Sequence, residues 1–424
     1  YCKKLTIIAV SGEINKLSLR SCCSLTDVGS LGKVRTLDLS ACHEITDVSA
    51  LGKVHTLILS SCSGIYDVSA LGGVHTLDLS HCPNVSNVDA LGGVHTLDLS
   101  FCSKVRDVYS LQDVPVLNLA YTGVRDISDI CFIGEIDITG CRIDTETINL
   151  SSAIKVNAMN CYGLRSLDSL SGATTHLKCS TIECSEPEWS LRSLESLTIN
   201  CPYFSDDYVK HLSHLKSMTM LKCNSITDVS PLANLETLTI TKCNGITDVS
   251  MLGNLQTLKL VECDGITDVS ALSKVKNLTI IGCKNVSDVS ALGTVHTLDL
   301  SKCVSVTDVS SLGGVHTLNL SGCDSITDVS MLGSVTDLNL SRCAQVTDVS
   351  ALGNVRTLNL SFCSGITSLH GTRGSATHYS IDISGCPNIV SIESLARVPR
   401  INLSKTNVTD VSPIRGSYEV DISC

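Results

Sequence analysis

The chain has 424 residues, of which 43% are hydrophobic and only 3% aromatic, and it carries a net charge of −11. This acidic balance, with no basic run, argues against a nucleic-acid partner, because backbone phosphates attract a basic surface. The sequence contains no apolar stretch of 18 residues, so we expect no membrane span. The scarcity of rings predicts a core of Leu, Val, Ile and Cys, which is unusual for a globular enzyme.

The sequence is organised by a unit of twenty residues, Val74–Gly93, which begins again at Val94. Around Leu77 and Leu79 apolar and polar residues alternate, which is typical of a strand with one buried face. From residue 85 to 91 the apolar spacing widens to three, which favours an irregular or 3₁₀-like return segment. Such a unit buries its apolar face only against its neighbours, so the sequence predicts a stacked solenoid.

Taken in chain order, the repeats form a regular block at 14–113, an irregular block at 114–214, a second regular block at 215–377 and terminal repeats at 378–424. We expect one solenoid over 1–424, an α/β-type fold dominated by β structure. Its arc of about 21 repeats would carry one parallel sheet on the concave face. Neither end reads as a polar cap, so we expect the ends to be covered by further repeats or by neighbouring chains.

The polar strand residues should face solvent while the leucines between them are buried. This expectation applies to three positions in each strand motif, and the residues concerned are Thr36, Asp38, Ser40, Thr76, Asp78, Ser80, Thr96, Asp98, Ser100, Thr297, Asp299 and Ser301.

Cysteines recur at one repeat position, at 22, 42, 62, 82 and 102 and again every twenty residues from 223 to 363. The simplest interpretation is that small apolar thiols point inward and fill the corner where the strand turns. Disulfides and metal ligation are the alternatives. Stacked cysteines have poor geometry for a bridge, and no CxxC pair indicates zinc. Free thiols favour a reducing, intracellular compartment, whereas nine N-x-S/T sequons permit a secreted or cell-surface protein.

Two further columns have a structural and a metal interpretation. An aspartate precedes each return turn in the T-D-V-S motif and its variants, where it can cap backbone N–H groups. A calcium ladder is the alternative, although it needs more oxygens per ion than this motif supplies. His55, His75 and His95, echoed by His296 and His316, could bind a transition metal, but Arg35 and Lys276 occupy the same column. We therefore expect no metal and no cofactor, and no catalytic motif is present.

Repeats such as NSITDVSPLANLETLTITKC resemble the short leucine-rich repeats of the internalin-like class, with Cys where that class has Asn. The Cys-containing T-D-V-S wording is similar to arrays of kinetoplastid protozoa and giant viruses. The resemblance covers nearly the whole chain and implies that the concave sheet binds other proteins. The repeat of twenty residues, where internalin-like units have 22, departs from the class.

We therefore expect a non-enzymatic scaffold for protein–protein interaction. A structural or surface component of a coat or shell is the alternative, and an unrecognised enzyme is a third hypothesis. Interface anchors are typically aromatic and Arg side chains in a distinct setting, which the irregular block provides. The candidate partner-binding residues are Trp189, Tyr203, Phe204, Arg192 and Lys178 in and beside that block, with Asp78, Asp98 and Asp299 on the regular concave sheet.

Overall fold

The computed structural model describes residues 5–8, 14–128, 130, 134–143, 152–161, 174–180, 192–371, 380–396 and 398–423. Backbone contacts divide the chain into two compact units, Tyr1–Cys201 and Pro202–Cys424, called here the first and the second unit. No helix in the described ranges is long and apolar enough to cross a membrane. That both units form one continuous solenoid over 1–424 stays a prediction.

Each unit is a stack of short parallel strands that follow one another in chain order. The strands of the first unit are β1 (Lys16–Ser18), β2 (Thr36–Asp38), β3 (Thr56–Ile58), β4 (Thr76–Asp78), β5 (Thr96–Asp98), β6 (Val116–Asn118), β7 (Glu135–Asp137), β8 (Lys155–Ala158), β9 (His176–Cys179) and β10 (Ser196–Ile199). Those of the second unit are β11 (Ser217–Leu221), β12 (Thr237–Thr241), β13 (Thr257–Val261), β14 (Asn277–Ile281), β15 (Thr297–Asp299), β16 (Thr317–Asn319), β17 (Asp337–Asn339), β18 (Thr357–Asn359), β19 (Ser380–Asp382), β20 (Arg400–Asn402) and β21 (Glu419–Asp421).

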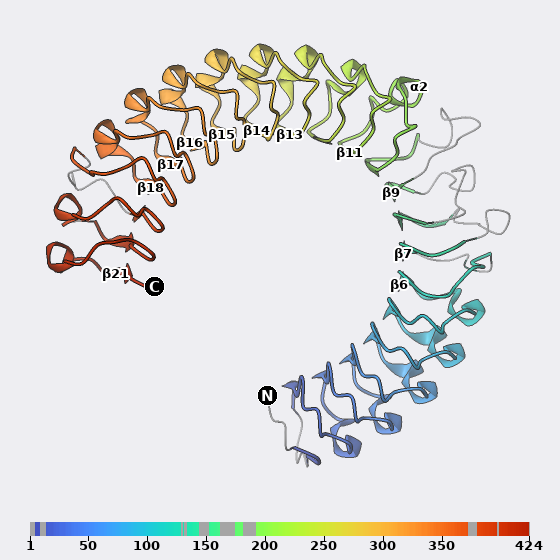
Figure 1. Cartoon of the computed structure of the whole chain (residues 1–424). Helices are drawn as coiled ribbons and strands as arrows, with labels where there is room; N and C mark the ends of the chain where they lie inside the picture. The colour runs from blue at the N-terminus through green and yellow to red at the C-terminus, as the bar shows by residue number, and fades with distance from the viewer. Residues whose placement is uncertain are drawn as a thin grey trace. The chain divides into compact units, whose positions relative to one another are not determined.

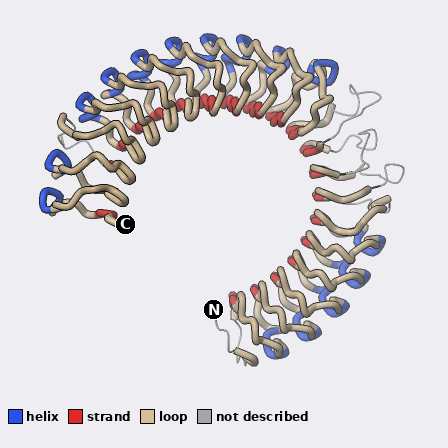
Figure 2. The backbone as a smooth tube through the Cα atoms, in the orientation of Figure 1, coloured by secondary structure: helices blue, strands red, loops and turns tan. Residues whose placement is uncertain are grey.

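Short 3₁₀ helices form the return segments, as the widened apolar spacing predicts. They are η1 (Gly29–Leu31), η2 (Ser49–Leu51), η3 (Ser69–Gly73), η4 (Asp89–Gly93), η5 (Tyr109–Leu111), η7 (Ser230–Leu232), η8 (Ser250–Asn254), η9 (Ser270–Lys274), η10 (Ser290–Thr294), η11 (Ser310–Gly314), η12 (Ser330–Leu332), η13 (Ser350–Asn354), η14 (Glu393–Leu395) and η15 (Ser412–Ile414). One α-helical turn, α2 (Asp206–Val209), opens the second unit (Figure 1). Within each unit the strands line the inner edge and the 3₁₀ helices the outer edge (Figure 2).

The core consists of columns of apolar side chains, one residue per repeat in each column. In the repeat that begins at Val74, the buried residues are Val74, Leu77, Leu79, Cys82, Val85, Val88 and Leu91, each at most 1% exposed. Parallel pairing keeps these columns aligned, because Leu57 lies opposite Leu77 twenty residues further on. The predicted burial of the leucine columns is confirmed.

In most repeats strand length follows the residue at the third strand position; β1 and β3, with Ser18 and Ile58 there, are exceptions of three residues. Where that residue is aspartate, its Oδ1 accepts the N–H two residues further on, which ends the ladder after three residues; this holds for Asp38, Asp78, Asp98 and Asp299, at 2.8–2.9 Å. Where it is Thr219, Thr239, Lys259 or Thr279, no such bond forms and β11–β14 run for five residues. The aspartate therefore acts as a local stop signal.

The same bond corrects one prediction about the strand surface. The threonines and aspartates of the strand motif are half-buried and lie on the solvent side, but three of the serines expected beside them are buried: Ser40, Ser100 and Ser301 are at most 7% exposed. The strand has already ended at the aspartate, so its alternation no longer sets the side of the serine; Ser80, which has the same bond, stays half-buried. Each serine is held against its carboxylate, and the chain turns at the next residue, as at Ala41 with φ of 57°.

The cysteine column lies in the core, as predicted. The column residues are free thiols and are at most 3% exposed. Most donate Sγ–H to a carbonyl of the preceding repeat, as Cys82 does to the carbonyl of Leu59 at 3.2 Å. Burial raises the pKa of most thiols of the column that are shifted, for example that of Cys102 to about 11.

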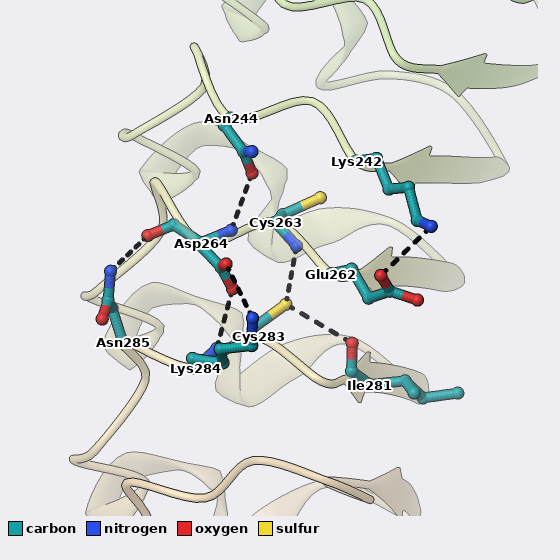
Figure 3. Close-up of polar contacts among 9 residues, drawn as sticks. All are labelled: Lys242, Asn244, Glu262, Cys263, Asp264, Ile281, Cys283, Lys284 and Asn285. Atoms are coloured by element: carbon teal, nitrogen blue, oxygen red, sulfur yellow. Dashed lines mark hydrogen bonds and ion pairs between the residues drawn. The ribbon is translucent and has the colours of Figure 1, made fainter.

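Beside the cysteine column a ladder of side-chain bonds joins the turns of the second unit (Figure 3). The N–H of Asp264 donates to Asn244 Oδ1 at 3.0 Å, and the N–H of Lys284 donates to Asp264 Oδ1 at 3.1 Å. The N–H of Cys263 donates to Cys283 Sγ at 3.4 Å. Each turn thus supplies the hydrogen bond that its neighbour needs.

The aspartates of the T-D-V-S column cap the return segments, which confirms that interpretation. In each case Oδ1 accepts the N–H two residues further on, at 2.8–3.0 Å, and the residues are Asp27, Asp47, Asp67, Asp107, Asp228, Asp248, Asp268, Asp288, Asp308, Asp328 and Asp348. Hydrogen bonds from Ser330, first from its backbone N–H, lower the pKa of Asp328 below its usual value. The pKa of most other aspartates of the column is lowered by the same kind of hydrogen bonds.

Candidate functional site

The inner face of the first unit changes character over β6–β10. Regular strands present threonine at the first strand position, whereas these five strands present Val116, Glu135, Lys155, His176 and Ser196. A groove of about 370 Å³ lies over this face. We call it the central groove, and its lining residues are Val116, Leu117, Asn118, Glu135, Ile136, Asp137, Lys155, Val156, Asn157, His176, Leu177, Lys178 and Ser196.

An ion pair crosses the middle of the central groove. Lys155 Nζ donates to Glu135 Oε1, and the two residues are register partners on β7 and β8. Both side chains are almost half exposed, so the pair contributes at most about 1 kcal/mol to stability. Its effect is to fix one positive and one negative group at defined places on the surface.

A row of carboxylates and amides runs along one side of the groove. Asn118 Nδ2 donates to Asp98 Oδ2 at 2.9 Å, and Asn157 Nδ2 donates to Asp137 Oδ2 at 2.7 Å. In both aspartates Oδ1 is already occupied by a backbone N–H of its own turn. These carboxylates are therefore held in place by two partners each, an arrangement that suits recognition rather than proton transfer.

The far end of the groove is positively charged. Lys178 projects from β9, is exposed, and forms no hydrogen bond or ion pair with any residue in the described part of the chain. His176 beside it is also exposed, and its Nδ1 lies 2.8 Å from Thr175 Oγ1. No group of three or more His, Cys, Asp or Glu side chains among the described residues could hold a metal ion.

Of the predicted partner-binding residues near the irregular block, two are described in the first unit. Lys178 lines the central groove, and Arg192 is exposed in the turn that precedes β10. Tyr203 and Phe204 belong to the second unit and have opposite environments: Tyr203 is 85% exposed, whereas Phe204 is completely buried and stacks on Tyr208 at 5.2 Å. Phe204 thus packs in the core and is not available to a partner. Trp189 lies outside the described residues.

The predicted aspartates of the regular sheet are surface residues with structural bonds. Asp78 on β4, Asp98 on β5 and Asp299 on β15 are half-buried, and each ends its strand through Oδ1. Asp78 and Asp98 are register partners, so two negative side chains stand beside each other. Asp98 alone adjoins the central groove, through its bond to Asn118.

The histidine column forms ring contacts. The rings of His55, His75 and His95 lie 4.7 and 4.6 Å apart between centroids, and those of His296 and His316 lie 4.9 Å apart and nearly parallel. All five residues are exposed, at the entrance to their strands. Stacked imidazoles at this spacing extend the surface of the sheet without facing a common point.

A second aromatic row was missed from the sequence. The rings of His81, Phe101 and Tyr121 stack with centroids 4.2 and 4.7 Å apart, and Phe101 and Tyr121 are 43% and 44% exposed. All three residues have φ near +60° in the tight turn after the strand. The row ends on Gly140, where a Cβ would lie 2.5 Å from the Tyr121 ring. The signal was an aromatic residue at the same repeat position in successive repeats.

A scan against protein-family models finds no match, and neither does a search of curated proteins. Among solved structures the chain is similar to TLR13 in its complex with ssRNA13, with 17% identity, a TM-score of 0.56 and coverage of 97% of this chain and 64% of that one. It is also similar to the mouse RP105/MD-1 complex, with 16% identity, a TM-score of 0.58 and coverage of 97% and 82%. An internalin, inlF, from Listeria monocytogenes aligns at 17% identity over 90% of this chain and 84% of that one, and its TM-score of 0.28 supports no argument. The fold is a leucine-rich repeat solenoid dominated by β structure.

Proposed function

We propose that this chain is a non-enzymatic scaffold that binds a protein partner on the central groove. The observation that carries the proposal is the change of surface over β6–β10, where the repeated threonines give way to an ion pair, amides, a histidine and a free lysine. Repeated small residues present one surface many times, whereas a distinct patch gives a partner a single position and orientation.

The chemistry of the groove favours a protein over a nucleic acid. Its charges have both signs: Glu135 pairs with Lys155 on the next strand, and Asp137 and Lys178 lie on either side of Asn157. A polyanion would meet carboxylates there, on a chain of net charge −11. The solved structures similar in fold include a complex with ssRNA13 and the RP105/MD-1 complex, so the experiment should include both classes of ligand.

Arg192 and Tyr203 stay proposed contacts because both side chains are exposed, and Trp189 stays a hypothesis. The similarity to kinetoplastid and giant-virus arrays, which rests on the T-D-V-S sequence motif, is also a hypothesis.

Site-specific photo-cross-linking tests where the partner sits. A benzophenone amino acid replaces His176 in the groove or, as a control, the exposed Ala70 in η3 on the outer edge. The partner cross-linked from position 176 is identified and purified, and its affinity is measured. We expect Lys178→Glu to weaken it at least about 10-fold, since a buried interfacial charge pair is lost.

The control variant is Lys53→Glu, which makes the same charge change at an exposed outer position. It should leave the affinity unchanged. The proposal is wrong if position 70 captures the same partner as efficiently as position 176, or if Lys178→Glu binds like the unaltered chain. It is also wrong if the only species cross-linked at position 176 is a nucleic acid or another copy of this chain, the latter being expected of a shell component.

A further inference from the structure

Three arginines line a hollow on the first unit away from the central groove. The hollow has a volume of about 540 Å³ and is called here the arginine pocket; its lining residues are Ser103, Arg106, Thr122, Gly123, Val124, Arg125, Gly140 and Arg142. The pocket has no acidic residue in its lining. This is unusual on a chain with a net charge of −11.

The pocket exists because two consecutive turns are shorter than the turn before them. In the repeat of β5, three residues, 103–105, complete the turn from Cys102 to the buried Val105, whereas only two residues follow Thr122 to reach the buried Val124. The turn after Cys141 is shortened in the same way. Glycines at 123 and 140 add no side chain that could fill the space.

The arginines replace small residues of the repeat. Arg106 and Arg125 occupy the position before the capping aspartate, where Thr26 and Thr46 stand in regular repeats. All three guanidinium-bearing residues are exposed, and within the described ranges none of them forms a hydrogen bond or an ion pair. Asp107 and Asp126, which follow Arg106 and Arg125 in the sequence, line a separate hollow that shares only Arg106 with the pocket.

The pocket therefore presents up to fifteen N–H donors and three positive charges, with no carboxylate among its lining residues. A planar guanidinium matches a phosphate or carboxylate with two parallel hydrogen bonds. A phosphate monoester carries between one and a half and two negative charges at neutral pH, roughly twice the charge of a carboxylate. Its three oxygens can be shared among the three arginines.

The aromatic row beside the pocket argues against a single-stranded nucleic acid. Nucleic acids of this kind bind by stacking bases on open ring faces. The ring of Tyr121 is covered by Phe101 at 4.7 Å on one side and approaches Gly140 on the other. No open aromatic face is available in this row next to the arginines, and the acidic chain offers no continuing basic track for a polyanion.

We propose that the arginine pocket binds a phosphorylated side chain of a partner protein, with Arg106, Arg125 and Arg142 as the phosphate ligands. The proposal rests on the proposed function only in taking the partner to be a protein. The phosphorylated residue would enter the pocket while the partner also contacts the first unit.

The test uses the full chain and the probe acetyl-Ala-phosphoserine-Ala-amide. Three comparison ligands are used: the peptide with serine in place of phosphoserine, the peptide with glutamate there, and the oligonucleotide dT10. Binding is measured calorimetrically at low and physiological salt. We expect saturable binding of the phosphopeptide that weakens with salt, and at least about 10-fold weaker binding of both other peptides. Arg125→Gln should weaken phosphopeptide binding by about 10-fold, the loss of one charge-assisted contact.

Arg35→Gln is the matched control, since Arg35 is an exposed arginine of the same unit outside the pocket. It should bind the phosphopeptide like the unaltered chain. Equal losses in Arg35→Gln and Arg125→Gln would overturn the proposal, as would the absence of saturable binding or tighter binding of dT10 through the same arginines. Lys178→Glu, which tests the central groove, should leave phosphopeptide affinity unchanged, so that failure of one site is distinguishable from failure of the other.

Discussion

Replacing one thiol of the buried column should change the pH dependence of stability more than stability itself. Cys343 is completely buried, and its Sγ donates to the carbonyl of Leu320 at 3.1 Å. Burial raises the pKa of its thiol from 9.0 to about 11. Cys343→Ala removes a single atom from the core and with it this titration.

At neutral pH the cost of Cys343→Ala should be small. Removing one buried apolar group of methylene size costs about 0.8 kcal/mol, and a small residual cavity adds a few tenths more. The carbonyl of Leu320 keeps a partner, since it also accepts the N–H of Cys323 at 3.1 Å. We therefore expect a loss of about 1 kcal/mol at pH 7, as measured by urea unfolding.

Above pH 9 the difference in stability between the unaltered chain and Cys343→Ala should shrink. The thiol of the unfolded chain ionises at its ordinary pKa, whereas the folded thiol stays protonated up to about pH 11. Ionisation thus favours the unfolded state, and the stabilising contribution, present in full below pH 9, is lost as the pH rises towards the folded pKa. At pH 10 the unaltered chain loses about 1.4 kcal/mol through this residue, and the alanine variant loses nothing through it.

The two stability curves should therefore meet near pH 10. Urea unfolding at pH 7, 8, 9 and 10 under reducing conditions, followed by circular dichroism, measures the difference. The other cysteines, tyrosines and lysines are common to both chains and cancel. Curves that stay parallel over this range would show that the thiol is not shielded from water and would refute the reasoning.

Two other substitutions test the turns. Asp328→Asn should leave stability at neutral pH nearly unchanged, because the amide oxygen can still accept the N–H of Ser330, while Asp328→Ala should destabilise the chain. Since the pKa of Asp328 is lowered, its extra contribution is present above its ordinary pKa and is lost as pH falls through the lowered value; acid titration of both variants tests this. Gly140→Ala should destabilise the chain by more than Gly322→Ala, as measured by thermal unfolding. Both glycines have φ near +70°, where an alanine costs about 1–2 kcal/mol in either variant. Only at Gly140 would the new methyl group also meet a ring, that of Tyr121 at 2.5 Å. Equal costs would show that the ring moves away freely.

The stacking of the core was predictable because it depends on local alternation alone. Leu77 and Leu79 point to one face whatever the neighbouring repeats do, and the period of twenty brings equivalent residues together. The burial of Ser40 was not predictable in this way. The strand ends at Asp38, whose side chain accepts the N–H of Ser40, two residues before the alternation in the sequence ends.

The candidate site, unlike the core, could not be predicted from local alternation. Tyr203 and Phe204 are adjacent in the sequence, and outside a strand no period indicates which ring points inward. The arginine pocket was not predicted from the sequence, although Arg106 and Arg125 stand at one repeat position beside a shortened turn. Net charge conceals such a feature, because it averages three arginines with every carboxylate of the chain.

Because the repeats are nearly identical, a strand can pair with the wrong neighbour during folding. A strand such as β4 could pair with a strand two repeats away, looping out one whole repeat, and almost every core contact would be reproduced, since Val54, Val74 and Val94 are interchangeable. Local sequence cannot penalise such an error. The groove strands can, because a shifted pairing of β7 or β8 would break the ion pair between Glu135 and Lys155: at the same strand position β2–β5 have threonine, β6 has valine and β9 has histidine. The irregular strands would thus fix the strand register of the first unit, because among its described residues the pair of Glu135 and Lys155 is the one ion pair between neighbouring strands.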